Sequence, residues 1–221
     1  MRKRPKALAL ALATHLPQTL AMVTLATIGS TIAGVTGWKV MLVAATVLSG
    51  QASVGWSNDF IDAKVDAQLA RADKPVVRDQ LDPATLRLPI AIALVALVPL
   101  SYLAGGAVGG TAHLIAVASA WSYNLFLSRT IWSWVPYVVS FSLLCVFVLQ
   151  SASGSSWPSP LLLALASLIG VIAHLLNALP DIDRDIRAGL GGLAVSLGKR
   201  ATWALALALV PLAILMLWFT F

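Results

Sequence analysis

Residues 159–179 have the sequence SPLLLALASLIGVIAHLLNAL, and residues 180–187 follow with PDIDRDIR. The first run carries no charged side chain and has the length of about 20 residues that an α-helix needs to cross a bilayer. Three aspartates, Asp181, Asp183 and Asp185, come directly after it. Because a carboxylate is costly inside lipid, the apolar helix is expected to end where they begin. This stretch predicts a transmembrane helix that carries an acidic cluster at its end.

The rest of the chain repeats the apolar character of this run. The sequence is 59% hydrophobic and 11% charged, whereas soluble domains carry about 25% charged residues. Seven apolar segments are predicted, at roughly 13–35, 39–57, 84–105, 110–128, 132–151, 159–179 and 201–220. The sequence therefore predicts an all-α, polytopic transmembrane helix bundle of about seven spanning helices, formed by one domain over residues 1–221.

The basic residues are distributed unevenly between the breaks. Of the 15 lysines and arginines, all except Lys39 fall on one alternate set of breaks, which also contains both acidic stretches. By the positive-inside rule, this pattern predicts a multi-pass membrane protein with its N-terminus and both acidic stretches in the cytoplasm. The net charge of +6 is thus explained by membrane topology. The expected environment is membrane lipid, with no nucleic-acid partner.

The first acidic stretch, residues 58–82, has the sequence NDFIDAKVDAQLARADKPVVRDQLD, and with the second it contains all nine acidic residues of the chain. Asn58, Asp62 and Asp66 are spaced i, i+4, i+8, which places them on one face of a helix. Asp59 is spaced i, i+3, i+7 with Asp62 and Asp66. Such oxygen ligands suit Mg²⁺, which favours one or two carboxylates together with substrate phosphates. Incidental acids in solvated loops are the alternative, but they would be expected in every loop.

The second stretch repeats the spacing, since Asp181 and Asp185 are separated by four residues while Asp183 points elsewhere on a helix. Two such acidic faces on one side of a membrane suit Mg²⁺ ions that hold a diphosphate. Three basic residues near them, Arg71, Lys74 and Arg129, are the better candidates for phosphate contacts, although basic residues in inside loops also set topology. Folding is expected to bring the two stretches together.

Two uncharged polar sets lie near these stretches. His174 and Asn177 share one face of the helix before the second stretch, where they either orient a substrate or form packing hydrogen bonds between helices. Gly50, Gln51 and Ser53 precede the first stretch, and close helix packing is preferred for them over a cavity-lining role. The single cysteine, Cys145, lies in an apolar run and indicates no disulfide framework.

The two motifs together resemble the UbiA superfamily of intramembrane prenyltransferases. Asn58-Asp59-x-x-Asp62-x-x-x-Asp66, with Lys74-Pro75 after it, is similar to the first aspartate-rich motif of that family. Asp181-Ile-Asp-Arg-Asp185, followed by Gly189 and Leu193–Gly198, is similar to the second. The segment from Tyr123-Asn124 to Arg129 is similar to a weaker feature between them, without the Pro and paired Lys-Arg often found there. The resemblance extends from the first predicted helix to the seventh.

This resemblance implies a helical bundle around a central cavity and a Mg²⁺-dependent enzyme, a transferase of alkyl groups other than methyl. It would transfer a prenyl group from an isoprenyl diphosphate to an aromatic or other lipophilic acceptor. A terpene cyclase of the same fold, acting without an acceptor, and a non-catalytic protein that binds divalent cations remain alternatives. The family usually has about nine helices, so the chain is expected to lack the last two.

Carried over by position, the resemblance assigns roles to individual residues. The implied metal ligands are Asn58, Asp59, Asp62, Asp66, Asp181 and Asp185, of which Asp62, Asp66, Asp181 and Asp185 are the implied catalytic residues. The implied diphosphate ligands are Arg71, Lys74 and Arg129. The implied substrate pocket is formed by Tyr123, Asn124, His174 and Asn177.

Overall fold

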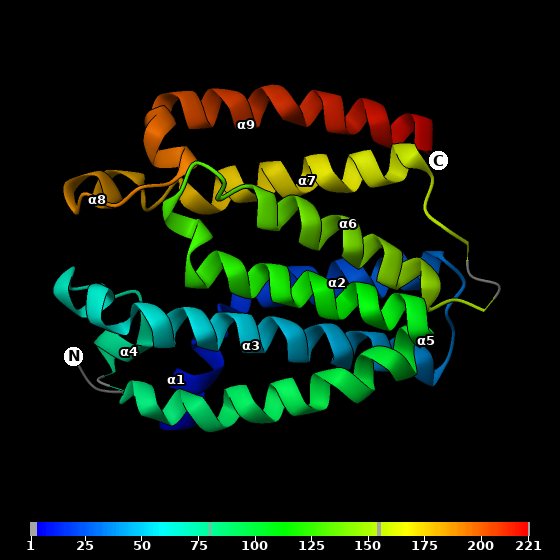
Figure 1. Cartoon of the computed structure of the whole chain (residues 1–221), viewed down its shortest axis with the longest axis horizontal. Coiled ribbons are helices and arrows are strands. Elements are labelled where there is room, and N and C mark those ends of the chain that lie inside the picture. Colours follow the sequence, from blue (N-terminus) through cyan, green and yellow to red (C-terminus); the bar gives the residue numbers. More distant parts are fainter. Residues whose placement is uncertain (1–3, 80, 154–155, 221) are drawn as a thin grey trace.

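The computed structural model describes residues 4–79, 81–153 and 156–220, and within these residues every regular element is a helix (Figure 1). The α-helices are α1 (Lys6–Leu12), α2 (Leu16–Ile32), α3 (Trp38–Gln68), α4 (Pro75–Arg78), α5 (Arg87–Leu125), α6 (Val135–Gln150), α7 (Pro160–Ala178), α8 (Ile182–Arg187) and α9 (Leu193–Thr220). Two short 3₁₀ helices, η1 (Pro83–Leu86) and η2 (Leu127–Arg129), flank α5. The predicted all-α fold is confirmed.

Helix α5 is a hairpin of two antiparallel arms and accounts for two of the seven predicted segments. Gly106 breaks the helix with a φ of 62°, a value that glycine adopts without steric cost. Across the break, Ser101 Oγ lies 2.9 Å from His113 Nδ1. In a straight helix, residues twelve apart would be separated by about 18 Å. The break predicted between residues 105 and 110 is therefore a reversal of the chain.

Each predicted apolar segment corresponds to a helical segment, although the boundaries differ. By length and composition, four helices are able to cross a membrane, and α1 with α2 makes a fifth if that pair, bent by 60°, is one span. Helix α6 is shorter, with 16 residues. The bend between α1 and α2 was not predicted, because the first apolar segment was placed at 13–35 and residues 6–12 were left outside it.

The bundle places both acidic stretches at one end (Figure 1). The C-terminal end of α3, α4, α8 and the N-terminus lie at that end, and the C-terminus lies at the opposite end. Away from the acidic end, α2, α3 and α6 enclose an apolar core around Phe147, whose side chain is fully buried. Nearer that end, a second core around Leu86 joins α1, α4 and the start of α5. These two cores fix α3, which carries the first acidic stretch, whereas Ile182 of α8 packs in a third core with Leu179 and Ala194.

A close approach of the chain to α3 positions the α1–α2 bend. Gly55 of α3 faces the backbone of Thr14, and a side chain at Gly55 would collide with the Thr14 carbonyl. The next residue, His15, has a left-handed backbone with a φ of 57°, which is uncommon for a residue other than glycine. This arrangement lays the His15 imidazole alongside the acidic part of α3.

Candidate functional site

The first acidic motif lies on the last turns of α3, which continues as a helix to Gln68. Asn58, Asp62 and Asp66 line one cavity of about 620 Å³ at the acidic end of the bundle, hereafter the polar cavity. Their shared face is the one that the i, i+4, i+8 spacing predicted. The Asp66 side chain is almost fully buried, and its Oδ2 atom has no hydrogen-bond partner among the described residues.

The second motif enters the same cavity from the other side of the bundle. Asp181 precedes α8, Asp185 lies one turn later, and both line the polar cavity. Asp183 instead accepts a hydrogen bond of 2.8 Å from Lys199 at the surface. Burial, followed by the nearby charge of Asp181, raises the pKa of Asp185 above its usual value. The two stretches, distant in the sequence, therefore share one site.

Arg71 connects the two stretches directly. Its guanidinium donates to both carboxylate oxygens of Asp181 at 3.1 Å and lies 3.7 Å from Asp66. The turn that ends α3 sets this position, because Ala70 is left-handed and the Arg71 amide donates back to the Asp66 carbonyl, the pattern of a Schellman C-cap. Although partial burial opposes it, the hydrogen bond and charge of Arg71 lower the pKa of Asp73.

Lys74 and Asp59 form a buried ion pair in the wall of the polar cavity. Lys74 Nζ donates to Asp59 Oδ1 at 2.8 Å and to Asn58 Oδ1 at 2.6 Å. The Asp59 side chain is 0% exposed, and His15 Nε2 lies 3.0 Å from the same Oδ1 atom. Asp59 thus contacts a lysine and a histidine and lines the polar cavity with Asp62 and Asp66. A direct metal contact by Asp59 stays a prediction, and its Oδ2 atom has no hydrogen-bond partner among the described residues.

Arg129, at the end of η2, approaches the site from the loop after α5. Its guanidinium donates to Asp62 Oδ1 at 3.0 Å, and its side chain is 49% exposed. Two arginines that reach the cavity, Arg71 and Arg129, are therefore each held by a carboxylate of a different motif. Both can exchange that partner for a phosphate oxygen, which a guanidinium binds in the same geometry.

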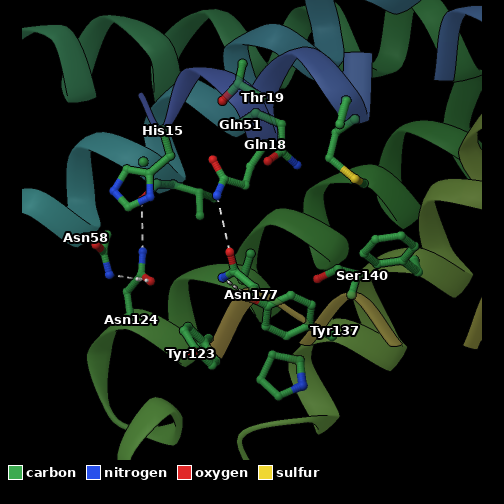
Figure 2. Close-up of a pocket in the computed structure, with 18 of the residues that line it drawn as sticks. His15, Gln18, Thr19, Gln51, Asn58, Tyr123, Asn124, Tyr137, Ser140 and Asn177 are labelled. Carbon is green, nitrogen blue, oxygen red and sulfur yellow. Dashed lines mark hydrogen bonds between the residues drawn. The ribbon is translucent and has the colours of Figure 1, made fainter. Parts of the chain in front are cut away.

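A second cavity of about 550 Å³ adjoins the polar cavity and extends between α2, α3, α5, α6 and α7. Apolar side chains such as Met22, Leu25 and Phe141 form much of its wall, and we call it the apolar cavity. Figure 2 shows its polar wall, where Gln18 and Asn177 are hydrogen-bonded. The two cavities share six residues: His15, Gln18, Asn58, Tyr123, Leu176 and Asn177.

An aromatic cluster lies where the two cavities meet. The Tyr123 and Tyr137 rings pack edge to face with centroids 5.4 Å apart, and the His174 ring lies 5.1 Å from Tyr137. His174 is almost fully buried, and its Nε2 atom lies 3.2 Å from Ser133 Oγ. Asn177 donates to the Tyr137 hydroxyl at 2.8 Å. Three of the four predicted pocket residues therefore lie at this junction.

The fourth predicted pocket residue, Asn124, mainly contacts α3. Its amide donates to the Val54 carbonyl at 2.9 Å and to Ser57 Oγ at 2.8 Å, and its oxygen accepts from Asn58. Asn124 borders the apolar cavity and holds the start of the first motif against α5. It combines a cavity position with a packing contact between helices.

Three cavity residues were not singled out from the sequence: Tyr137, Gln18 and His15. Tyr137 lies in an apolar run with no motif around it, and Gln18 is one of several scattered amides. His15 was visible only as a lone histidine in an apolar segment. A polar residue inside a predicted membrane span is the one signal that favours a functional position for Gln18 and His15.

The residues of the polar cavity fit Mg²⁺ with substrate oxygens. Among the described ranges, no group of three or more His, Cys, Asp or Glu side chains is arranged to hold a metal ion. Mg²⁺ commonly takes one or two carboxylates and completes its shell with water and phosphate oxygens. The unpartnered, buried Oδ2 of Asp66 and the repulsion between Asp181 and Asp185 are features that a cation there would relieve.

Comparison with known proteins identifies the family. The UbiA prenyltransferase family matches the chain over residues 7–221. The digeranylgeranylglyceryl phosphate synthase of Archaeoglobus fulgidus is 29% identical over 175 residues, which cover 76% of this chain and 58% of that protein. This chain thus covers less than two thirds of that relative's length.

Solved structures share the fold. A UbiA homolog from Archaeoglobus fulgidus, solved bound to GPP and Mg²⁺, matches with a TM-score of 0.79 and 14% identity, over 96% of this chain and 77% of that chain. The apo structure of a UbiA homolog from Aeropyrum pernix K1 matches with a TM-score of 0.68 and 20% identity, over 91% and 77%. The family match over nearly the whole chain confirms the resemblance seen in the two motifs: this chain belongs to the UbiA prenyltransferase family.

Proposed function

We propose that this protein transfers a prenyl group from an isoprenyl diphosphate to an aromatic or other lipophilic acceptor within the membrane, with Mg²⁺ as its cofactor. The observation that carries the proposal is the junction of the two cavities. A charged cavity lined by both motifs adjoins an apolar cavity, and Tyr123 and Asn177 line both. A diphosphate requires the first environment and a prenyl chain requires the second.

The polar cavity binds the diphosphate end of the donor in this proposal. Its Mg²⁺ ligands are Asn58, Asp62, Asp66, Asp181 and Asp185, assisted by Asp59, whose Oδ2 atom has no partner among the described residues. Mg²⁺ bound there supplies charge that stabilises the leaving diphosphate. Arg71 and Arg129 exchange their carboxylate partners for phosphate oxygens. Lys74 contributes positive charge in the cavity wall and holds Asn58 in place through its hydrogen bond of 2.6 Å.

The reaction occurs at the junction. The bond between the allylic carbon and the diphosphate oxygen breaks, and the bonding electrons leave with the diphosphate. The faces of Tyr123 and Tyr137 stabilise the allylic cation, because an aromatic ring attracts positive charge. The apolar wall excludes water, which would quench the cation. The acceptor forms the new bond to the allylic carbon and loses a proton to the departing diphosphate, while His174 and Asn177 orient the acceptor.

Membrane orientation is part of the proposal. We place the N-terminus and both motifs on the cytoplasmic side, where a water-soluble diphosphate leaving group is released. Support comes from the basic residues on one alternate set of breaks and from the position of both motifs at one end of the bundle.

The test is turnover by the purified protein in detergent. Prenyl diphosphates of several chain lengths are supplied with and without Mg²⁺ and with and without phenolic acceptors, and diphosphate release and product mass are measured. A prenylated acceptor formed only with Mg²⁺ supports the proposal. A Mg²⁺-dependent hydrocarbon product formed equally without an acceptor indicates a cyclase. Mg²⁺ binding without diphosphate release from any donor indicates a non-catalytic protein.

A further inference from the structure

Gln51 is a polar residue in the apolar cavity that the proposed reaction does not use. It lies on α3 two helical turns before Asn58, and both residues line that cavity (Figure 2). It is the fourteenth residue of the helix, counted from Trp38, so it lies about 20 Å from the helix start. A polar side chain this deep in a predicted membrane span is costly and marks a functional position by default.

Each other carboxamide of this cavity has at least one hydrogen-bond partner, and Gln18 donates to Asn177. Asn124 donates to Val54 and Ser57 of α3. Asn58 accepts from Lys74, and Asn177 donates to the Tyr137 hydroxyl. No described residue forms a hydrogen bond with the Gln51 side chain. Its amide atoms are also not among the polar atoms that are buried away from the cavity space without a partner. Its amide therefore keeps both its donor and its acceptor available to a molecule in the cavity.

The charge of the cavity wall restricts that molecule. No aspartate, glutamate, lysine or arginine lines the apolar cavity among the described residues, and His15 is its only basic side chain. An anionic group there would be desolvated without a compensating charge, which is strongly unfavourable. A hydroxyl or carbonyl oxygen instead finds the amide of Gln51. The prenyl chain of a donor needs neither group, so the acceptor is the molecule to which the amide is suited.

We propose that Gln51 is a specificity-determining residue that hydrogen-bonds a neutral hydroxyl or carbonyl oxygen on the acceptor, and that the apolar cavity rejects acceptors with an anionic head group. The assignment to an acceptor rests on the proposed prenyl transfer. Seven residues along α3 separate Gln51 from Asn58, or about 10 Å. The recognised oxygen therefore lies on the side of the acceptor away from the diphosphate.

The experiment uses three probes of similar size in detergent at pH 7.5: 4-octylphenol, its methyl ether 4-octylanisole, and 4-octylbenzoate as the anion. Binding is measured by calorimetry for the wild type, Gln51→Met and Gln51→Asn. Gln68→Met is the matched control, because Gln68 lies on α3 and is exposed outside both cavities. Diphosphate release from geranyl diphosphate with Mg²⁺ is measured in parallel on every variant.

The wild type is expected to bind 4-octylphenol at least about tenfold more tightly than 4-octylbenzoate. Gln51→Met is expected to weaken 4-octylphenol binding by about tenfold, the effect of losing one neutral hydrogen bond in a buried site. Gln51→Asn is expected to recover part of this loss of affinity, and Gln68→Met is expected to bind 4-octylphenol as the wild type does. The wild-type affinity for 4-octylanisole is expected to lie between those for the phenol and the benzoate. Diphosphate release is expected to be unchanged by Gln68→Met, because Gln68 lies outside both cavities.

Two results would overturn the inference. The first is that the wild type binds the benzoate as tightly as the phenol. The second is that Gln51→Met binds the phenol as tightly as the wild type does. If Gln51→Met does not give a monodisperse protein, Gln51→Asn and the wild-type probe series decide the question. Absence of diphosphate release from the wild type counts against prenyl transfer alone, because the probe affinities are measured independently of turnover.

Discussion

Replacing Asp59 by Asn tests whether the buried pair with Lys74 supports the site structurally. The substitution keeps the shape of the side chain and removes its charge. Lys74 is 9% exposed at its side chain and Asp59 is 0% exposed, so the lysine charge would remain buried with only neutral oxygen and nitrogen partners. We expect the free energy of unfolding to fall and the first motif to lose rigidity, because Lys74 also holds Asn58.

The magnitude follows from the contacts. Asp59 Oδ1 receives a charge-assisted bond of 2.8 Å from Lys74 and a second contact of 3.0 Å from His15. Removing one charged partner of a buried ion pair typically lowers the free energy of unfolding by about 3–5 kcal/mol. Because the Asn carbonyl can still accept one bond, we expect the lower end, about 3 kcal/mol. For a domain of this size that corresponds to a fall in Tm of roughly 6–12 °C.

The assay is thermal unfolding in detergent without Mg²⁺, followed by tryptophan fluorescence. Asp59→Asn is compared with Asp62→Asn, which affects a carboxylate 26% exposed in the cavity and is expected to change Tm little. The double variant Asp59→Asn with Lys74→Met removes both charges and is expected to recover most of the loss. An unchanged Tm for Asp59→Asn, combined with loss of Mg²⁺ binding, would refute the structural role and favour a direct metal contact.

The remaining predictions concern the cavity and the topology. Asp62→Ala and Asp185→Ala are each expected to lower Mg²⁺-dependent turnover by at least about a hundredfold, because several kcal/mol of leaving-group stabilisation are lost. The control Asp82→Ala removes only the cap of η1 and is expected to retain activity. Equal losses at all three positions would contradict the motif assignment. Mg²⁺ with inorganic diphosphate is expected to raise Tm by mass action, and neither component alone is expected to do so fully; a shift with diphosphate alone would argue against metal-mediated binding. In oriented cells, an impermeant thiol reagent is expected to label Ser153→Cys and to leave Ala72→Cys unlabelled; labelling of Ala72→Cys from outside would reverse the proposed orientation.

Local patterns in the sequence determined the helices and the motif on α3. Apolar runs of spanning length can hardly adopt another structure in lipid, because every backbone group must be hydrogen-bonded internally. The spacing of Asn58, Asp62 and Asp66 fixed their common face, since a helix repeats every 3.6 residues. The Gly105-Gly106 break was also predictable from local sequence, because glycine readily adopts the backbone conformation that interrupts a helix. The bend at His15 was not, because its cause is the distant Gly55, which lets the Thr14 backbone approach α3.

Only the tertiary structure decided which partners the site residues have. Close packing was expected for Gln51, and only the arrangement of the helices around α3 shows that it lines a cavity. The contact of Arg71 with Asp181 joins residues 110 positions apart, and the approach of Tyr137 to His174 joins two separate helices. Helix formation depends on neighbours in the chain, whereas these contacts depend on how the finished helices pack against one another.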